Sequence, residues 1–152
     1  HRLAQRGELM THHKDKTVLS IIAVEDVLEN DFKKVRADNK LGGLVKAISR
    51  SKRNIFTVVN DEKELVGVIS LDDIRDIIFN TELYEKVEVS EIMQTPPAII
   101  DKNEKMEKVL EIFEETGAWN LPVTDEGRYI GFISRSKIFS SYRKLLKEFS
   151  DD

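Results

Sequence analysis

The stretch GVISLDDI at residues 67–74 recurs, with changes, as GFISRSKI at residues 131–138. Both copies read glycine, two apolar residues, serine, two variable residues, a charged residue and isoleucine. An apolar run that ends at a serine and leads into a second amphipathic run is typical of a strand that turns into a helix. The copies differ at the charged position, which is Asp73 in the first and Lys137 in the second.

The similarity extends well beyond this stretch. At an offset of 65 residues, VEDVL (24–28) aligns with VSEIM (89–93), and Phe56-Thr57-Val58 aligns with Leu121-Pro122-Val123. One residue is missing from the second copy near Gly127, so the opening stretch aligns at an offset of 64. The chain is therefore predicted to contain two copies of one unit. The expected divisions are a linker from a preceding domain (1–23), the first unit (24–80), a connector (81–88), the second unit (89–143) and a C-terminal helix end or tail (144–152).

Within each unit the hydrophobic period changes in the same order. Apolar residues at positions 41, 44, 45 and 48 have the spacing of one helix face, and two short β-rich runs follow at 54–59 and 64–70. A second helix is predicted after each serine, at 71–79 and at 135–149. With a short strand near Val35 and its counterpart Ile100, each unit is β-α-β-β-α. The predicted fold is α+β, with the two units packed as a pseudo-twofold pair.

Several residues are candidates for the ends of these helices. Asp38 is a plausible N-cap for the first helix, and Asp101 with Glu104 has the spacing of a capping box in the second unit. Gly117 stands where a left-handed C-terminal glycine would end that helix. The pair Gly42–Gly43 is unfavourable inside a helix by about 1 kcal/mol each relative to alanine. Such a pair indicates close approach of another backbone or a loosely formed first turn.

Ser70 and Asp73 admit two interpretations. Ser-x-x-Asp before an apolar run is close to a capping box, and spacing alone favours that structural role. The two roles are compatible, because a helix N-terminus also offers free amides to a phosphate. In that case the Ser70 hydroxyl would donate to a phosphate, and Asp73 would accept from a pair of ribose hydroxyls. Lys137 cannot accept from a diol and could only reach an anion.

With these residues in view, the chain resembles a tandem pair of CBS domains, also called a Bateman module. The resemblance rests on the hydrophobic-x-Val motifs at 56–58 and 121–123, followed by Gly67-Val68-Ile69-Ser70-x-x-Asp73 and Gly131-Phe132-Ile133-Ser134. It covers residues 24–143. Each motif is short, but both occur twice, in order and at matched spacing. What the family implies is an adenine nucleotide (AMP, ADP or ATP) bound in a cleft between the two units, with no other cofactor required.

The resemblance assigns roles residue by residue. Asp73 would hold the ribose, Ser70 would lie by the phosphates, and the backbone at Lys34 and Val35 would meet the adenine edge. Two departures from the family pattern matter: Thr57 replaces a common proline, and Lys137 replaces the ribose-binding acid. We therefore expect at most one good nucleotide site, on the first unit. The predicted site residues are Ser70, Asp73, Lys34, Val35, Thr57 and Val58, and the weaker second set is Ser134, Lys137, Ile100 and Pro122.

Composition narrows the function classes. The chain has 152 residues, is 40% hydrophobic and 34% charged, and carries a net charge of −4, so a nucleic-acid partner is not expected. It has no cysteine, which removes disulfides, thiolate zinc sites and cysteine nucleophiles. No Ser-His-Asp arrangement, HExxH or P-loop is present, so the protein is not expected to be an enzyme. The metal candidates, His12-His13 with Asp15 and the acids at 72, 73, 76 and 82, lack ligand patterns, and no metal site is predicted.

Two further segments have their own interpretations. The basic run Arg50-Ser51-Lys52-Arg53 is expected to be a solvated helix end that favours the C-terminal dipole. Trp119 is more consistent with a packing or dimer contact than with base stacking.

The first residues, HRLAQRGELMTHHKDKTVL, resemble the segment that joins the last membrane helix of a CLC-type chloride channel or transporter to its CBS pair. The chain begins at His1 rather than methionine, so we expect a piece of a longer protein. This resemblance implies a non-catalytic regulatory domain on the cytoplasmic face of the plasma or inner membrane, attached to a transmembrane channel domain and forming a homodimer. Two other interpretations stay open: the CBS module of a soluble enzyme or of another transporter, and a ligand-free structural dimerisation module.

Overall fold

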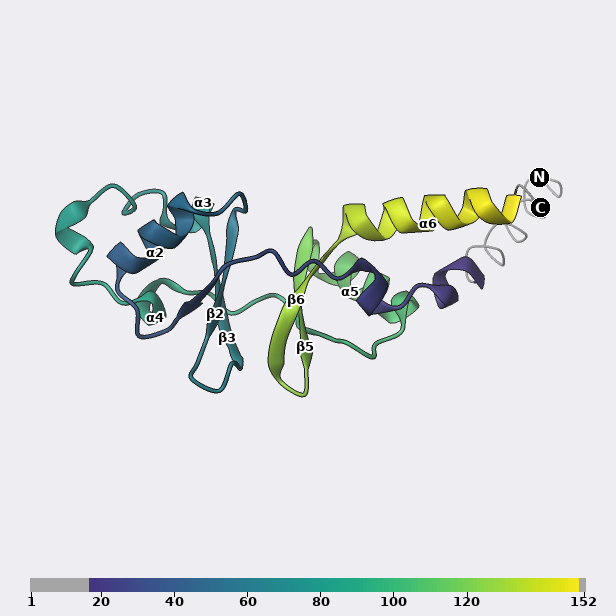
Figure 1. Ribbon diagram of the computed structural model, residues 1–152, viewed down its shortest axis with the longest axis horizontal. Coiled ribbons are helices and arrows are strands. Elements are labelled where there is room, and N and C mark those ends of the chain that lie inside the picture. The colour runs from purple at the N-terminus through teal and green to yellow at the C-terminus, as the bar shows by residue number, and fades with distance from the viewer. Residues whose placement is uncertain (1–16, 151–152) are drawn as a thin grey trace.

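The computed structural model describes residues 17–150 and contains two three-stranded sheets with helices around them (Figure 1). In the first unit the elements are η1 (Val24–Val27), β1 (Lys34–Arg36), α2 (Leu41–Ser49), β2 (Ile55–Val59), β3 (Leu65–Ser70) and α3 (Leu71–Ile74), and η2 (Thr81–Leu83) follows in the connector. In the second unit they are α4 (Val89–Ile92), β4 (Ile100–Asp101), α5 (Met106–Thr116), β5 (Asn120–Asp125), β6 (Arg128–Ser134) and α6 (Arg135–Ser150). The predicted order of strands and helices is confirmed.

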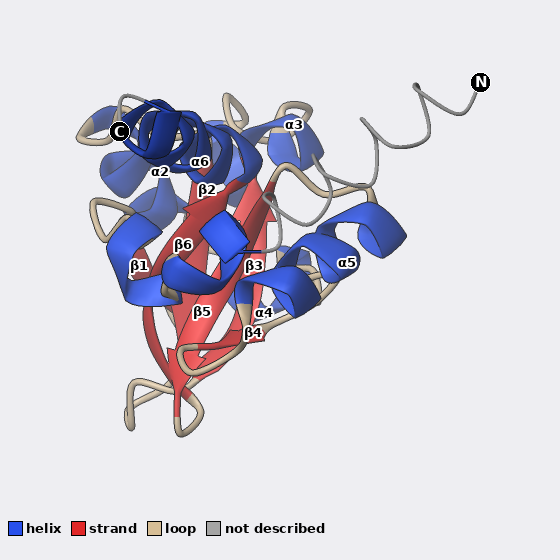
Figure 2. Cartoon of the chain, turned by 90° about the vertical axis from the view of Figure 1, so that its right-hand side faces the viewer, coloured by secondary structure: helices blue, strands red, loops and turns tan. Residues whose placement is uncertain are grey.

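The two sheets have the same topology. β1 pairs with β2 in parallel, with Val35 opposite Val58, and β3 pairs with β2 antiparallel. In the second sheet β4 pairs with β5 in parallel, with Ile100 opposite Val123, and β6 pairs with β5 antiparallel. Figure 2 shows the strands together in the centre with the helices around them. The fold is therefore α+β, and the two units form a pseudo-twofold pair.

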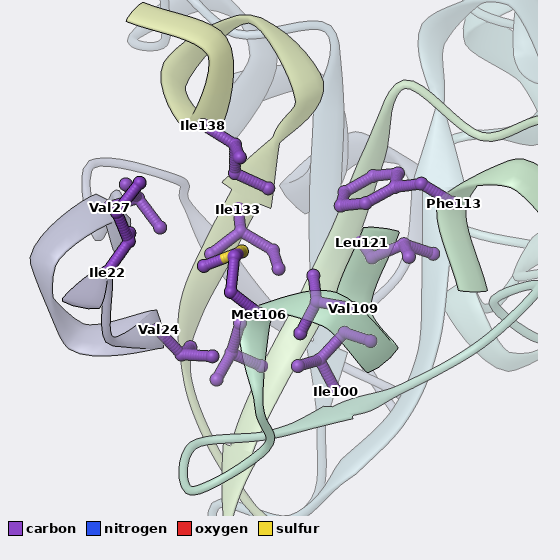
Figure 3. Packing of buried hydrophobic residues seen from close by; sticks show 11 residues of the cluster. Ile22, Val24, Val27, Ile100, Met106, Val109, Phe113, Leu121, Ile133 and Ile138 are labelled. Carbon is purple, nitrogen blue, oxygen red and sulfur yellow. The ribbon is translucent and has the colours of Figure 1, made fainter. Parts of the chain in front are cut away.

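The short helical segment at the start of each unit packs on the other unit. In η1, Val24 and Val27 are buried with Ile133 and Met106 of the second unit, as Figure 3 shows. Conversely, Val89 of α4 is fully buried in the core of the first unit. Burial of such side chains contributes about 1.5–3 kcal/mol each. The two units are thus interlocked rather than only in contact.

A third apolar cluster lies where the two sheets meet. It consists of Phe32 and Val59 from the first unit and Tyr129 and Phe132 from the second. The ring centroids of Phe32 and Phe132 are 4.5 Å apart. Aromatic pairs at this separation add to the stabilisation from buried area. This cluster fixes the relative position of the two sheets.

A pair of isolated β-bridges repeats the pseudo-twofold symmetry. Glu29 and Phe132 exchange two backbone hydrogen bonds of 2.8 Å. Their counterparts Gln94 and Val68 exchange two of 2.8 and 2.9 Å. The segment that enters each unit therefore pairs with the last strand of the other unit. The glycines of the repeated stretch allow this approach, because a Cβ atom on Gly131 would lie 2.6 Å from the Glu29 main-chain oxygen.

The capping residues predicted for α2 and α5 are wrong, whereas α3 and α6 begin directly after Ser70 and Ser134 as predicted. The N-cap of α2 is Lys40, and Asp38 instead pairs with Arg36 at 3.1 Å. The N-cap of α5 is Lys105, so Asp101 and Glu104 form no capping box. The Asp101 carboxylate accepts from the backbone N–H of Asn103 at 2.9 Å, which makes a turn before the helix.

The glycine predictions fare better. Gly117 ends α5 with a φ of 70°, in the left-handed region, as expected. Gly42 donates its backbone N–H to the Tyr84 oxygen at 3.0 Å, and a Cβ atom there would lie 3.2 Å from the Tyr84 Cβ. Gly42 therefore admits another backbone, whereas Gly43 has nothing within 4 Å of its Cβ position.

The second helices of the two units are unequal. α6 confirms the helix expected at 135–149 and ends at Ser150, whereas α3 ends at Ile74 and the chain continues through turns to Phe79. The helix expected at 71–79 is therefore mostly wrong. α6 begins with Arg135, whose guanidinium donates to the Phe113 and Ala118 oxygens at 2.6 Å. Arg135 thus satisfies carbonyl groups at the C-terminus of α5.

Candidate functional site

The corner of the first unit is formed where β3 ends and α3 begins. Ser70 is the N-cap of α3 in extended conformation, but its side chain makes no capping hydrogen bond. The structural role favoured by spacing is therefore only half realised, since the residue caps by position and not by side chain. Asp73 lies in the first turn of α3 and is exposed. Both polar side chains of this corner are left available.

The other predicted residues of the first unit lie on β1 and β2. The strand register places Lys34 opposite Thr57 and Val35 opposite Val58. Lys34 is exposed, whereas the side chains of the other three are buried, Thr57 and Val58 completely. A ligand at this corner would therefore meet the backbone of these strands rather than their side chains. Part of that backbone is already used, because the Thr57 N–H donates to the Lys33 oxygen at 3.1 Å.

The corner of the second unit is filled by the protein itself. The Ser134 hydroxyl accepts from the Lys137 backbone N–H at 3.1 Å, which caps α6, and donates to a Glu29 carboxylate oxygen at 3.3 Å. Ile100 and Pro122 are buried, and Lys137 is exposed. A serine that already accepts from an amide and donates to a carboxylate has little capacity left for a ligand. The two corners therefore differ in more than the exchange of aspartate for lysine.

Sequence reasoning missed the carboxylate that reaches this corner. Glu29 also pairs with Arg53 at 2.5 Å, and Arg53 donates two hydrogen bonds to Asp31, at 3.0 and 2.9 Å. The Arg53 guanidinium stacks over the Phe32 ring at 4.5 Å. The expectation of a solvated Arg53 is wrong, because this side chain links three residues that precede β1. No local signal could have revealed Glu29, which lies 105 residues before Ser134.

Charge pairing in this group shifts two pKa values. Hydrogen bonding to Asp31 raises the pKa of Arg53, and the same bond lowers the pKa of the Asp31 carboxyl. Both groups are therefore charged across the physiological range. An approaching anion meets carboxylates as well as the guanidinium at this place, which disfavours a second nucleotide near Ser134.

Two buried hydroxyls lie at the junction of the sheets. Thr57 Oγ1 and the Tyr129 hydroxyl have no hydrogen-bond partner of ordinary geometry. Burial raises the pKa of Tyr129 to about 12, against a lowering contribution from the nearby Thr57 hydroxyl. The proximity of Thr57 thus partly offsets the desolvation of Tyr129 without forming a well-aligned bond. The Thr57 side chain is completely buried, so its hydroxyl faces the interior of the protein.

Among the described residues, the other candidate groups do not assemble into a site. Within residues 17–150 no group of three or more His, Cys, Asp and Glu side chains is arranged to hold a metal ion. His12, His13 and Asp15 lie outside the described residues. Trp119 is 73% exposed, and the Arg135 guanidinium lies 5.4 Å from the centre of its ring. The role of Trp119 as a dimer contact stays a prediction.

A cavity of about 170 Å³ lies at the far end of the first sheet, lined by Arg36, Ala37, Asp38, Val59, Asn60 and Asp61. Ligand pockets usually enclose roughly 300–1,000 Å³, and this cavity is away from Ser70, which pairs with the opposite end of β2. It is therefore not the predicted nucleotide site.

In the same described part of the chain, no helix is long and apolar enough to cross a membrane.

The family follows from a comparison of the whole chain. The model of the CBS domain family matches twice, at residues 24–80 and 89–144. The chain belongs to the CBS-domain family. Tandem CBS pairs of this kind are typically regulatory and non-catalytic, and this chain is a CBS regulatory module.

Two curated relatives are similar in sequence. An A-adding tRNA nucleotidyltransferase of Aquifex aeolicus is 31% identical over 87 residues, which are 55% of this chain and 10% of that enzyme. A CBS domain-containing protein of Dictyostelium discoideum is 26% identical over 137 residues, 83% of this chain and 94% of that protein. The chain therefore spans a small part of the first relative and nearly all of the second.

Solved structures show the same fold. CbpB in complex with c-di-AMP has a TM-score of 0.74 at 18% identity, covering 91% of this chain and 96% of that one. CBSX2 in complex with AMP has a TM-score of 0.66 at 23% identity, with 81% and 97% covered. The CBS domain of a bacterial CNNM/CorC family Mg²⁺ transporter is solved in two structures, each with a TM-score of 0.71 at 16% identity. The match covers 85% of this chain in both cases, and 79% and 80% of the solved chains. At these identities the likeness shows the fold alone.

Proposed function

We propose that this CBS pair is a sensor that binds one adenine nucleotide at the corner of its first unit. The observation that carries the proposal is the difference between the two corners. The Ser70 side chain makes no capping hydrogen bond and Asp73 is exposed, whereas Ser134 is engaged by Glu29 and by the Lys137 amide. Two proteins of the same fold are solved with AMP and with c-di-AMP, which supports an adenine-containing ligand.

The chemistry at this corner suits a ribose phosphate. The Asp73 carboxylate would accept hydrogen bonds from the two ribose hydroxyls, because an ionised carboxylate is an acceptor only. The Ser70 hydroxyl would donate to a phosphate oxygen. The exposed edge at Lys34 would offer backbone groups to the adenine, and its ammonium would add positive charge near the phosphates. Lys137 could supply none of the ribose contacts at the other corner.

Such a sensor acts by preferring one arrangement of the protein. A nucleotide that binds one arrangement of the two units, or of two modules in a dimer, more tightly would shift the population toward it. The shift is limited by the difference in affinity between the arrangements. Because η1 packs in the core of the second unit and α4 in the core of the first, a movement at one corner would affect the packing of both cores.

The attached domain is the finer part of the proposal. We infer a homodimeric regulatory tail of a CLC-type chloride channel or transporter on the cytoplasmic face of the membrane. Its support is the resemblance of the first residues, HRLAQRGELMTHHKDKTVL. The CBS domain of a Mg²⁺ transporter has the same fold, which supports attachment to a membrane protein of another transport family equally well. The hydropathy of the complete parent protein tests this attachment. Ten or more apolar spans upstream would support a channel or transporter domain, and a soluble enzyme domain in that place would overturn it.

The nucleotide proposal is tested by thermal unfolding with AMP, ADP and ATP separately. A ligand at 100 times its dissociation constant adds about 2.7 kcal/mol of apparent stability, which is several degrees for a chain of this size. The expected shift appears in the wild type and disappears in Asp73→Ala. The matched control is Lys137→Ala at the equivalent position of the second unit, which should keep the full shift.

Three outcomes are informative. If the shift is lost in Asp73→Ala and kept in Lys137→Ala, the result supports a single site on the first unit. Loss in Lys137→Ala only would place the ligand at the second corner and overturn the assignment. Absence of a shift with every nucleotide at millimolar concentration would favour the ligand-free structural dimerisation module.

A further inference from the structure

The C-terminal helix α6 turns a basic face away from the protein. Its inner face is fixed by Ile138, Tyr142 and Leu145, which pack on the core of the second unit. Successive residues of an α-helix are about 100° apart, so the opposite, outer face can be assigned from these contacts. This basic face carries four exposed cations, Lys137, Arg143, Lys144 and Lys147. Within residues 17–150 none of the four forms an ion pair, so their charge is available to a partner.

The two ends of the molecule carry opposite charge. α6 has five basic residues against Glu148 alone, a net charge of +4 in a chain whose total is −4. Residues 71–85, the acidic segment, have five exposed acids against Arg75 alone, a net charge of −4. In Figure 1, α6 lies toward the right end of the long axis and the acidic segment toward the left end. A negative surface therefore attracts the α6 end and repels the other, which orients the protein.

The described part of the chain also begins at the α6 end. Leu19 and Ile22 belong to the same core cluster as Tyr142 and Leu145 of α6. Figure 1 shows the first described residues, in purple, at the same end as α6. Residues 1–16 join the described part here, so under the proposed membrane attachment the basic face would be close to the membrane. Only this step rests on the proposed function, because the charge and the exposure of α6 stand without it.

We infer that α6 docks on an anionic lipid surface through its basic face. Lysine and arginine are attracted to anionic headgroups only within about a Debye length, so cations act together when they share one face of a helix. A helix of 16 residues presents its outer face over roughly 24 Å, which suits an extended flat surface. Phe139, which is 50% exposed at the edge of the basic face, adds an aromatic ring at headgroup level.

Sedimentation of the 152-residue chain with lipid vesicles tests the inference. Vesicles of phosphatidylglycerol and phosphatidylcholine in equal amounts are compared with vesicles of phosphatidylcholine alone. We expect the wild type to sediment with the anionic vesicles only, and to be released as salt is added because salt screens exposed charges. Lys144→Gln with Lys147→Gln should lower the partition constant roughly 30-fold, about fivefold for each cation removed from the surface.

A matched control separates the basic face from the net charge of the protein. Lys105→Gln with Lys108→Gln removes the same charge at the same spacing from the start of α5, where both side chains are exposed. This variant should bind the anionic vesicles as tightly as the wild type. Equal weakening in the two variants would show a general charge effect and would overturn the assignment to α6. Thermal unfolding of both variants should match the wild type, because all four lysines are exposed.

Two other outcomes would overturn the lipid surface. One is a wild type that does not sediment with the anionic vesicles at low salt. The other is a wild type that leaves the vesicles unbound but binds duplex DNA through Lys144 and Lys147, which would assign the basic face to nucleic acid. The vesicle experiment needs neither a nucleotide nor the attached domain. Failure of the nucleotide shift at Asp73, or a soluble enzyme upstream, would therefore leave its result unchanged.

Discussion

The main-chain oxygen of Glu29 lies 2.6 Å from the position of a Cβ atom on Gly131, so only glycine fits there without movement of a backbone. The equivalent position on Gly67 faces the Met93 sulphur at 2.7 Å. The symmetric glycines therefore have unequal neighbours, one rigid and one flexible.

This difference predicts unequal costs for the same substitution. Gly131→Ala should lower the free energy of unfolding by about 1–3 kcal/mol, because the bridge between Glu29 and Phe132 must shift. Gly67→Ala should cost less, because the Met93 side chain can rotate away. Urea denaturation of both variants makes the comparison. Equal costs would show that the approach of the backbone at Gly131 is not a constraint.

Gly43 provides a prediction of opposite sign. It is exposed inside α2, with nothing within 4 Å of its Cβ position, whereas Gly42 is close to Tyr84. Gly43→Ala should therefore raise the free energy of unfolding by about 0.5–1 kcal/mol. Gly42→Ala is the control and should not stabilise. Thermal unfolding of the two variants distinguishes them, and a destabilised Gly43→Ala would contradict the packing seen at this turn.

Arg53 is predicted to stabilise the protein through Glu29. Arg53→Met keeps an apolar chain over the Phe32 ring but leaves the half-buried Glu29 carboxylate without its guanidinium. The expected loss is about 1–2 kcal/mol in urea denaturation. Adding Glu29→Gln should recover part of that loss, because the unpaired charge is removed. Strict additivity of the two substitutions would show that the ion pair contributes nothing.

Much of the fold could be predicted from the sequence because the repeat carries it. Helical and alternating periods gave both three-stranded sheets, and Gly117 ended α5 as expected. The starts of α2 and α5 could not be predicted, since Lys40 and Lys105 cap by position without a capping side chain. The sequence also shows an apolar residue at position 27, but not that it packs in the core of the second unit.

The candidate site divided in the same way. The repeated stretch located Ser70 and Ser134 correctly at strand ends. The occupation of the second corner depends on Glu29, whose approach to Ser134 is fixed by tertiary structure and leaves no local pattern. Whether Asp73 binds ribose stays a prediction.

The crossed packing of η1 and α4 can be tested directly. Val27 lies at the start of the first unit, in η1, but is fully buried in the core of the second, and Val89 at the start of the second unit has the reverse arrangement. Val27→Ala should cost about 2 kcal/mol and speed amide hydrogen exchange in β5 and β6 more than in β2 and β3. Val89→Ala should show the opposite distribution. The same distribution in both variants would contradict the crossed packing.

Tyr129 makes stability depend on alkaline pH. Burial raises the pKa of its phenol to about 12 from an ordinary value of 10.0, so the folded state holds the proton more firmly than the unfolded state. This contribution is fully present below pH 10 and is lost as the pH rises toward 12, because the unfolded chain ionises first. Two pKa units correspond to roughly 2.7 kcal/mol.

Tyr129→Phe should remove this part of the alkaline decline. Below pH 10 the substitution should be close to neutral, because it removes a buried hydroxyl that has no hydrogen-bond partner of ordinary geometry. Urea denaturation of both proteins at several pH values between 8 and 12 isolates the phenol, since the other titrating groups are shared. Parallel curves for the two proteins would show that Tyr129 is not desolvated as the packing at the sheet junction requires. Thr57→Val is the companion variant: without the Thr57 hydroxyl the folded-state pKa of Tyr129 rises further, so the decline should begin at the same pH, which the unfolded chain sets, and become larger.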